Sequence, residues 1–310
     1  MLKYIAKRLG MMIPVVIGIS FLIFSIMSLT PGDPARLILG SYATEEDLNA
    51  WREEKGLNDP FFTQYINYVV NAVQGEFGRS YITNNLVIEE LGGRIPTSLI
   101  LTLCATFLMV LIGVPVGIIS AVKQYTSIDY ISMIAALLLT SIPAFWLGLL
   151  LILQFSLRWD IFPATGSDTW LHFVLPSITL SAAVMASLLR MTRSNMLEVI
   201  RQDYIRTARA KGATERRVVF KHALRNALLP VITVIGLSFG NMMGGALITE
   251  TVFGIAGVGT LLVTSVRMKD TPQVMICVLF IAVMIGIVNL LVDLLYIYID
   301  PRLKTQFVKG

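Results

Sequence analysis

Charged residues are scarce in this sequence of 310 residues. They make up 15% of it, against 55% hydrophobic residues, and the mean hydropathy is +0.73. The surface of a soluble protein of this size needs more polar residues than such a composition supplies. The scarcity of charge therefore excludes an ordinary soluble globular protein and predicts a polytopic membrane protein.

Cysteine and histidine are rarer still, with two of each. Cys104 and Cys277 both fall within apolar runs, where a cysteine is a packing residue, and their spacing predicts neither a disulfide framework nor a metal site. His172 and His222 belong to no metal-binding spacing. We therefore expect no metal site in the chain.

Catalytic motifs are missing as well. No G-x-x-x-x-G-K-[ST] stretch is present to hold nucleotide phosphates, and no G-x-S-x-G stretch is present to carry a serine nucleophile. The glycine-rich stretch 254–260, GIAGVGT, lacks the phosphate-binding lysine and is typical of turns. The sequence thus predicts no catalytic residue, no cofactor of its own and no enzymatic activity.

The sequence has instead six long apolar runs, each close to the roughly 20 residues that a helix needs to cross a bilayer. Few ionisable residues interrupt them: Asp293 lies well inside a run, and Glu250 and Arg190 lie at run ends. Ion-coupled transporters usually hold more such groups, and Asp293 is either an isolated functional acid or a structural partner near the membrane surface. The predicted spans are 9–29, 97–122, 131–157, 171–190, 227–250 and 274–299.

The charges between the runs predict the orientation of the chain. Residues 31–96 hold five Lys or Arg against ten Asp or Glu, whereas residues 191–226 hold nine against three. Because cytoplasmic loops of membrane proteins are enriched in Lys and Arg, we expect 191–226 and both termini in the cytoplasm and 31–96 outside. The basic residues of the termini are Lys3, Lys7, Arg8, Arg302, Lys304 and Lys309.

The basic stretch 191–226 has the pattern of a helix, a break and a second helix. Apolar residues recur at intervals of three and four before Gly212, which supplies a helix stop. Thr214 with Glu215 then offers the start of a second helix. The two expected apolar faces consist of Met196, Val199, Ile200, Tyr204, Ile205 and Ala208, and of Val218, Val219, Phe220 and Leu224.

Two functions fit such a segment. It can lie on anionic lipid as an amphipathic helix, or it can project and dock onto a cytoplasmic partner. The break at Gly212 favours docking, because a helix on a lipid surface gains nothing from an interruption. Nucleic acid is excluded as a partner, because a loop tied between two membrane spans cannot easily reach a major groove.

The stretch that begins at Tyr204, YIRTARAKGATERRVVFKHALRNALLPVI, resembles the cytoplasmic loop of ABC importer permeases. The strict E-A-A pattern of that loop is absent, but the stretch is similar to the variant RTARAKG…HALRNAL-P of dipeptide, oligopeptide and nickel permeases. The chain resembles the B-type subunit of that class over nearly its whole length. Further matching stretches are LTPGDPA (29–35), QGEFGRS (74–80), RIPTSLILT (94–102), VLPSITL (174–180), ETVFGIAGVG (250–259) and NLLVDLLYIYIDPRL (289–303).

The resemblance implies a type I ABC importer permease fold with six membrane helices, in the cytoplasmic (inner) membrane of a bacterium or archaeon. It implies a second, homologous permease as partner, two cytoplasmic ATPases that bind ATP and Mg, and an extracytoplasmic binding protein that delivers the substrate. Similar permeases carry peptides, glutathione, nickel chelates and other metallophores. A permease specialised for nickel or metallophores is therefore an alternative, and an ion-coupled secondary transporter is the rival of another class.

The resemblance also assigns a role to the basic loop, which would couple ATP hydrolysis to transport. Small residues would let the loop seat in a groove of the ATPase, cations would pair with its acidic groups, and Gly212 would permit the bend. The residues expected to form this contact are Arg206, Ala208, Arg209, Ala210, Lys211, Gly212 and Thr214.

The fifth predicted span carries a stripe of small residues at every fourth position, a pattern that brings membrane helices close together. The stripe either packs against the partner permease or lines the translocation path. Its residues are Gly236, Gly240, Asn241, Gly244 and Gly245.

Three segments are expected along the chain: an N-terminal membrane helix (1–30), an extracytoplasmic helical segment (31–96) and a core with five membrane helices (97–310). In the extracytoplasmic segment, Thr44 and Asp47 predict a capping box at the start of a helix that Gly56 stops. A second, amphipathic helix is expected over 60–75. These helices either cap the mouth of the pore or contact the binding protein.

Overall fold

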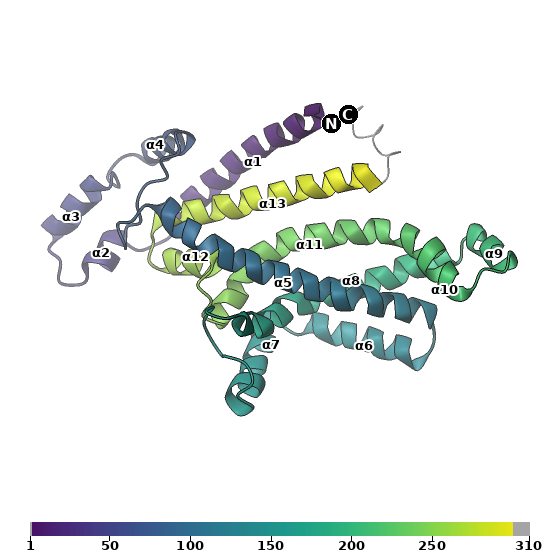
Figure 1. The fold of residues 1–310 in the computed structure, drawn as a ribbon. Helices are drawn as coiled ribbons and strands as arrows, with labels where there is room; N and C mark the ends of the chain where they lie inside the picture. Colours follow the sequence, from purple (N-terminus) through teal and green to yellow (C-terminus); the bar gives the residue numbers. More distant parts are fainter. Residues whose placement is uncertain (1, 300–310) are drawn as a thin grey trace. The chain divides into compact units, whose positions relative to one another are not determined.

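Residues 2–299 are described by the computed structural model, and they are helical almost throughout (Figure 1). No strand occurs among them, and their only β-type pairing is an isolated bridge between Arg79 and Leu86. The predicted all-α class is therefore confirmed for this part of the chain. The basic residues expected near the C-terminus, Arg302, Lys304 and Lys309, lie outside the described residues.

Five helices of the described chain are long and apolar enough to cross a membrane. Large apolar side chains such as Ile13, Phe107 and Leu291 are exposed along them, as expected where lipid or another membrane helix covers the surface. These helices confirm five of the six predicted spans, although the second begins at Val87 rather than at residue 97. They are α1 (Leu2–Leu29), α5 (Val87–Val122), α8 (Val174–Ile200), α11 (Leu224–Val252) and α13 (Thr271–Ile299).

The predicted third span, 131–157, is not one straight helix. Helix α6 (Ser127–Ser141) and helix α7 (Ala144–Leu151), which continues as a π-helix (Ile152–Arg158), meet at an angle of 102°. Pro143 explains the break, because its ring holds the preceding Ile142 in an extended conformation (φ −84°, ψ 124°) that a helix cannot contain. The described residues contain six candidate spans when the bent pair is taken as one.

The described chain forms two compact units. Residues 99–255 and 287–299 form what we call the α8 unit, in which α8 packs against both α6 and α11. A short 3-10 helix (Trp170–Phe173) leads into α8. The core of this unit is a cluster of buried apolar side chains, and the acidic residues Asp129 and Glu250 are buried in the unit as well. The buried residues of the cluster are Leu101, Ala105, Met109, Leu175, Leu180, Leu188, Val231, Met242, Ala246, Phe253 and Ile255.

Residues 2–98 and 256–286 form what we call the α1 unit, so both expected N-terminal segments fall almost entirely within it. The capping box at Thr44 and the helix stop at Gly56 (φ +66°) are confirmed. Aromatic side chains of α4 (Phe61–Val73) pack edge-on or tilted against Phe21 and Phe24 of α1. Besides α1, the unit contains α2 (Pro34–Leu39), α3 (Glu45–Glu54), α4 (Phe61–Val73) and α12 (Val258–Arg267).

Two buried ionisable residues hold the loops of the α1 unit together. The Asp270 carboxylate accepts hydrogen bonds from Ser80 Oγ (2.5 Å) and from the Tyr81 backbone N–H (3.0 Å). Lys269 donates to the backbone carbonyls of Thr30 and Gly32. Burial raises the pKa of Asp270 and lowers that of Lys269. Residues 31–96, which the charge pattern predicts outside the membrane, are thus in direct contact with the two residues that precede α13.

Candidate functional site

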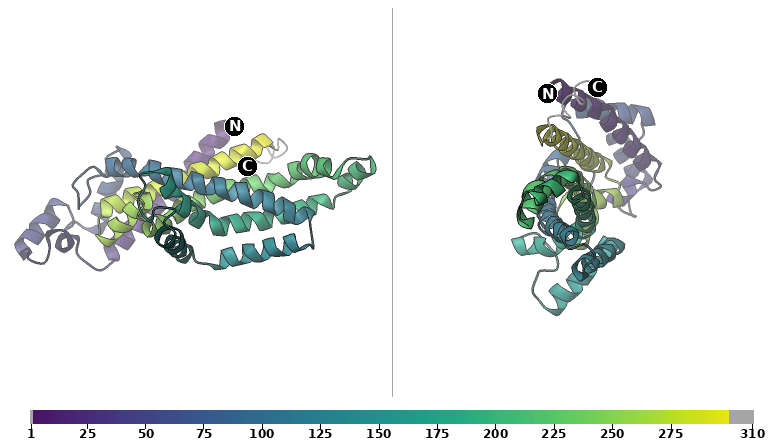
Figure 2. Two further views of the ribbon diagram at one scale, coloured as in Figure 1. Left: turned by 60° about the horizontal axis from the view of Figure 1, so that its bottom comes forward. Right: turned by 90° about the vertical axis from the view of Figure 1, so that its right-hand side faces the viewer.

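The basic loop forms a bent projection between α8 and α11. It contains α9 (Asp203–Ala210), a turn, the short helix α10 (Glu215–Arg217) and a π-helix (Val218–Ala223) that leads into α11. Figure 1 and Figure 2 show it at the end of the α8 unit where α5 turns into α6. Because α8 runs to Ile200 and α11 begins at Leu224, the loop is shorter than the predicted 191–226.

The first expected helix of the loop is divided in two. Helix α8 ends at Ile200, and Gln202, in an extended conformation (φ −69°, ψ 149°), precedes α9. The single apolar face predicted from Met196 to Ala208 is therefore wrong. Asp203 in the first turn of α9 suits a helix N-terminus, where an acidic side chain is stabilised.

Gly212 ends α9 as predicted. Its φ of +80° lies in the left-handed region, its N–H donates to the Arg209 carbonyl (2.9 Å), and the N–H of Ala213 donates to the Ala208 carbonyl (3.2 Å). These bonds define a Schellman motif, in which a left-handed residue satisfies the last carbonyls of a helix. Thr214 occupies the N-cap of α10, but its side chain makes no capping hydrogen bond.

The projection is fixed to the α8 unit by an apolar anchor. Ile205 of α9 is fully buried, whereas Tyr204 next to it is 45% exposed and accepts a hydrogen bond from Asn226 Nδ2 (2.9 Å). Phe220, expected on the apolar face of the second helix, is 59% exposed. The buried residues of the anchor are Ile118, Ala121, Met196, Ile205, Val218, Val219, Ala223 and Ala227.

The residues predicted to contact a partner lie on the outer side of this anchor. Of the seven, only Ala208 is half-buried, and the other six are exposed. We call these residues, on α9 and the turn after it, the coupling surface. Exposed small residues let a partner approach the backbone closely, and exposed cations suit an acidic partner. The exposed six are Arg206, Arg209, Ala210, Lys211, Gly212 and Thr214.

The cations of the coupling surface differ in their pairing. Arg209 binds Glu215 through two hydrogen bonds (2.7 and 3.3 Å), which lower the pKa of Glu215. Arg206 lies 3.8 Å from Asp203, an exposed pair that contributes little. Lys211 has no ion-pair partner among the described residues. The pairing of Arg209 braces the turn across Gly212, which leaves Lys211 and Arg206 as the cations most available to a partner.

A buried ion pair that the sequence pattern did not reveal lies near this loop. Arg193, counted among the loop cations, belongs to α8 and pairs with Asp129 of α6 through two bonds of 2.6 and 2.7 Å. Ser120 Oγ (2.5 Å) and the Tyr125 N–H (3.1 Å) also donate to Asp129, whose side chain is only 2% exposed. One carboxylate thus joins the end of α5, the start of α6 and α8.

The small residues of the fifth span do not share one environment. A Cβ atom at Gly236 would overlap Val292, so this glycine packs α11 against α13 of the same chain, and Gly240 is buried. A Cβ atom at Gly244 would meet nothing within 4 Å. Asn241 and Gly245 are exposed. Only the later part of the stripe is therefore open to a substrate or to another subunit.

Replacing Gly212 tests whether the turn matters. Gly212→Val is expected to reduce transport, because a β-branched residue is strained at this φ by roughly 1–2 kcal/mol, although no atom blocks its side chain. Gly212→Asn should keep most activity, because Asn tolerates the left-handed region. The measurement is the initial rate of substrate uptake at equal protein level. Equal rates for the two variants would show that the turn geometry is unimportant.

Comparison with known proteins decides what the chain is. A family model described as the binding-protein-dependent transport system inner membrane component matches residues 113–305, and the model of the N-terminal part of such membrane components matches residues 1–102. The chain belongs to this family. The permease is thus a multi-pass transport subunit, as the resemblance in its sequence indicated.

Two relatives match the permease over nearly their full length. The glutathione transport system permease protein GsiC of Escherichia coli (strain K12) is 43% identical over 304 residues, which cover 98% of this chain and 99% of the relative. The oligopeptide transport system permease protein AppB of Bacillus subtilis (strain 168) is 42% identical over 315 residues, which cover 98% and 100%. Both are permeases of peptide-class ABC importers.

Solved structures with a similar fold are also ABC transporters. An amino acid ABC transporter crystallised with histidines has a TM-score of 0.56 and 16% identity, and the match covers 67% of this chain and 94% of that chain. The inward-facing MetNI methionine ABC transporter has a TM-score of 0.56 and 17% identity, covering 68% and 96%. At these identities the likeness concerns the fold, which is that of a type I ABC importer permease.

Proposed function

We propose that the coupling surface of this permease receives an ATPase subunit and transmits its movement to the membrane helices. The observation that carries this proposal is the construction of the loop. Its inner side, around Ile205, is anchored in the core of the α8 unit, while its outer side presents exposed cations and small residues. A force on the outer side would therefore reach α8 and α11, because both helices contribute to the anchor.

The proposed assembly contains this permease, a second homologous permease, two cytoplasmic ATPases and an extracytoplasmic binding protein, in the inner membrane of a bacterium or archaeon. ATP and Mg would be bound by the ATPases and not by this chain. The family supports this composition, since its description names a binding protein and the inner membrane. The N-terminus and the loop would face the cytoplasm.

The proposed substrates are peptides, with glutathione as a peptide-like member of the class. The two relatives, a glutathione permease and an oligopeptide permease, match this chain at 43% and 42% identity over nearly its full length. Because the two identities are nearly equal, they do not favour one substrate over the other. The proposal therefore names the substrate class and no single substrate. The later part of the small-residue stripe, Asn241, Gly244 and Gly245, would line the path or meet the second permease.

A double charge reversal tests the coupling surface. Arg206→Glu with Lys211→Glu is expected to lower ATP-dependent peptide uptake by more than about tenfold, because like charges across the contact would repel the ATPase. Both side chains are exposed, so the variant should reach the membrane at the normal level. Uptake of a labelled peptide and recovery of the ATPase with the purified permease are the two measurements.

The matched control is Lys221→Glu with Arg225→Glu, which makes the same change of charge at exposed positions outside the coupling surface. This control should keep both uptake and the bound ATPase. If the coupling-surface variant also keeps both, the proposed contact is refuted. If both variants fail equally, the loss reflects the overall positive charge of the loop and not the coupling surface.

A further inference from the structure

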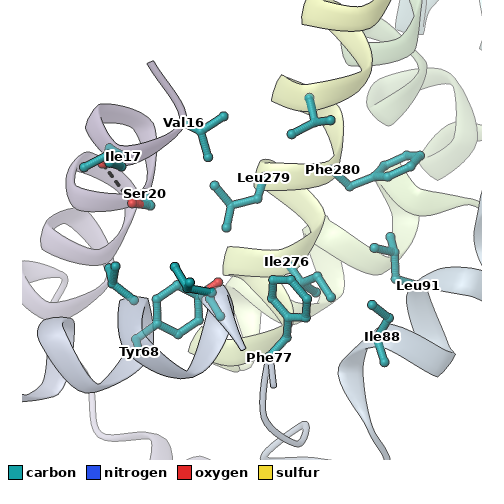
Figure 3. Close-up of a pocket in the computed structure, with 14 residues that line it drawn as sticks. Val16, Ile17, Ser20, Tyr68, Phe77, Ile88, Leu91, Ile276, Leu279 and Phe280 are labelled. Atoms are coloured by element: carbon teal, nitrogen blue, oxygen red, sulfur yellow. Dashed lines mark hydrogen bonds between the residues drawn. The ribbon is translucent and has the colours of Figure 1, made fainter. Parts of the chain in front are cut away.

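A pocket of about 390 Å³ lies in the α1 unit, between α1, α4, α5 and α13 (Figure 3). All of its lining side chains are apolar except those of Ser20 and Tyr68. This volume falls within the range of pockets that bind small molecules. A lining of this kind selects a hydrocarbon group, because a polar ligand would lose its hydration without gaining hydrogen bonds.

The pocket opens on the outside of the helices that form it. Ile17 of α1, Val73 of α4 and Ile88 of α5 all line it, yet they are 49%, 84% and 48% exposed. Helices α1, α5 and α13 are long and apolar enough to cross a membrane, where the outer surface of a helix faces lipid or another membrane helix. Helix α4 has no charged residue and exposes further apolar side chains, among them Phe62 and Ile66, as a helix at the membrane interface does.

One polar atom in the wall of the pocket lacks a partner. Tyr65 hydrogen-bonds through its hydroxyl to Ser20 Oγ (2.9 Å) and to the Ile17 carbonyl (3.2 Å). Tyr68, almost one turn later on α4, has a buried hydroxyl with no hydrogen-bond partner among the described residues. Figure 3 shows Tyr68 reaching from α4 toward Phe77 and Ile276. A buried hydroxyl without a partner is costly, so a ligand acceptor at this position would be stabilised by the Tyr68 donor.

The lining changes from polar to apolar along α13. A smaller pocket of about 140 Å³ shares Tyr68 with the apolar pocket, and its other lining residues include Lys55, Gln64 and Thr271. Thr271 begins α13, whereas the apolar pocket is lined by α13 residues from Ile276 to Val283. These residues span about 10 Å of helix, which is less than the depth of one leaflet, about 15 Å. Along this direction the polar side chains come first, then the Tyr68 hydroxyl, and then the apolar pocket. This is the order of the headgroup, the ester linkage and the acyl chain in a phospholipid.

We propose that this pocket binds one acyl chain of a phospholipid from the leaflet at the Thr271 end of α13. The ester oxygen of that lipid accepts a hydrogen bond from the Tyr68 hydroxyl. Burial raises the pKa of Tyr68, which keeps the hydroxyl protonated and able to donate. The lipid fills the space between α1, α4 and α13 and so holds α4 against the membrane spans.

Photolabelling of the assembled importer tests the proposal. The full complex would be placed in phospholipid vesicles that contain phosphatidylcholine with a diazirine in the middle of one acyl chain, irradiated and digested. Labelled peptides are expected to concentrate in the α1, α4 and α13 segments around the pocket. Ala72→Trp, which fills the pocket, should lower this labelling by about tenfold. The control Ile66→Trp, on the same helix but outside the pocket, should leave it unchanged.

A second pair of variants removes single hydroxyl groups. Tyr68→Phe should lower the labelling of the pocket by about fivefold through the lost hydrogen bond, whereas Tyr65→Phe should not change it. This pair still decides the matter if Ala72→Trp fails to assemble, because it removes one atom only. Labelling that is equal in all variants would overturn the proposal. Pocket peptides that crosslink to the second permease instead of lipid would overturn it too.

Discussion

Replacing Arg193 with methionine is expected to destabilise the permease by about 3–5 kcal/mol, the usual cost of leaving a buried charge without its partner. Asp129, which receives two hydrogen bonds from Arg193, is almost completely buried. Ser120 and the Tyr125 N–H would remain as donors, but neither carries a charge. The measurement is the midpoint temperature of thermal unfolding of the purified permease in detergent.

Two further variants make this prediction specific. Arg193→Met combined with Asp129→Asn removes both charges and should recover much of the lost stability, because no unpaired charge stays buried. Arg190→Met is the matched control, since the hydrogen bonds of the Arg190 guanidinium within the described chain go to hydroxyl groups, those of Thr140 (3.3 Å) and Ser187 (3.5 Å). Equal unfolding temperatures for Arg193→Met and Arg190→Met would contradict the importance of the ion pair.

The rescued double variant also separates stability from coupling. Arg193 lies in the last two turns of α8 before the helix reaches the break that precedes α9. Asp129 ties this end of α8 to α5 and α6. If the proposed function holds, the double variant should fold and still transport less per ATP hydrolysed, because the ion pair would no longer tie α6 to the end of α8 next to the coupling surface.

Features set by short stretches of sequence could be predicted. The five long spans depend on continuous stretches of the sequence, and the capping box at Thr44 and the left-handed turn at Gly212 depend on residues within one or two helical turns of one another. The bend at Pro143 belongs to the same group, because a proline within an apolar run was visible in the sequence. The length and hydropathy of the run do not predict the bend, because neither quantity takes account of the proline.

Features that depend on distant residues could not be predicted in this way. Asp129 and Arg193 are 64 residues apart, and no periodic pattern connects them. An acidic residue beside a long apolar run was the one available signal. The exposure of Phe220 has a different cause: the π-helix Val218–Ala223 has a wider turn than an α-helix. An apolar face predicted with the α-helical period of 3.6 residues therefore does not coincide with the buried face of the π-helix by the end of that segment.

The exposure of the candidate site could be expected from the sequence, but its electrostatics could not. Six of the seven expected contact residues are exposed, which a basic loop with small residues already suggested. The sequence did not reveal that Glu215 pairs with Arg209 across the turn, because that pairing requires the geometry of the Schellman motif. Likewise the small-residue pattern of α11 does not distinguish Gly236 from Gly244. An added Cβ atom would overlap Val292 at Gly236 and would meet nothing within 4 Å at Gly244.

Replacing Gly117 with alanine is expected to force α5 and α8 apart. A Cβ atom at this position would lie 2.7 Å from the backbone oxygen of Leu189 and 2.7 Å from Cβ of Thr192. Real Cβ atoms do not approach other atoms so closely, and the Leu189 oxygen belongs to a helix backbone that no change of rotamer can move. Overpacking of this kind typically costs about 1–3 kcal/mol, which exceeds the gain of up to about 1 kcal/mol from alanine in a helix.

The matched control is Gly18→Ala in α1, where an added Cβ atom would meet nothing within 4 Å. This variant should be as stable as the natural permease or slightly more stable. Gly117→Ala with Thr192→Gly removes the side-chain contact but leaves the carbonyl contact, so it should recover only part of the loss. Because α8 continues toward the coupling surface, Gly117→Ala should also lower uptake more than its loss of folded protein explains. Full stability of Gly117→Ala in the unfolding experiment would show that α5 and α8 are not held at this distance.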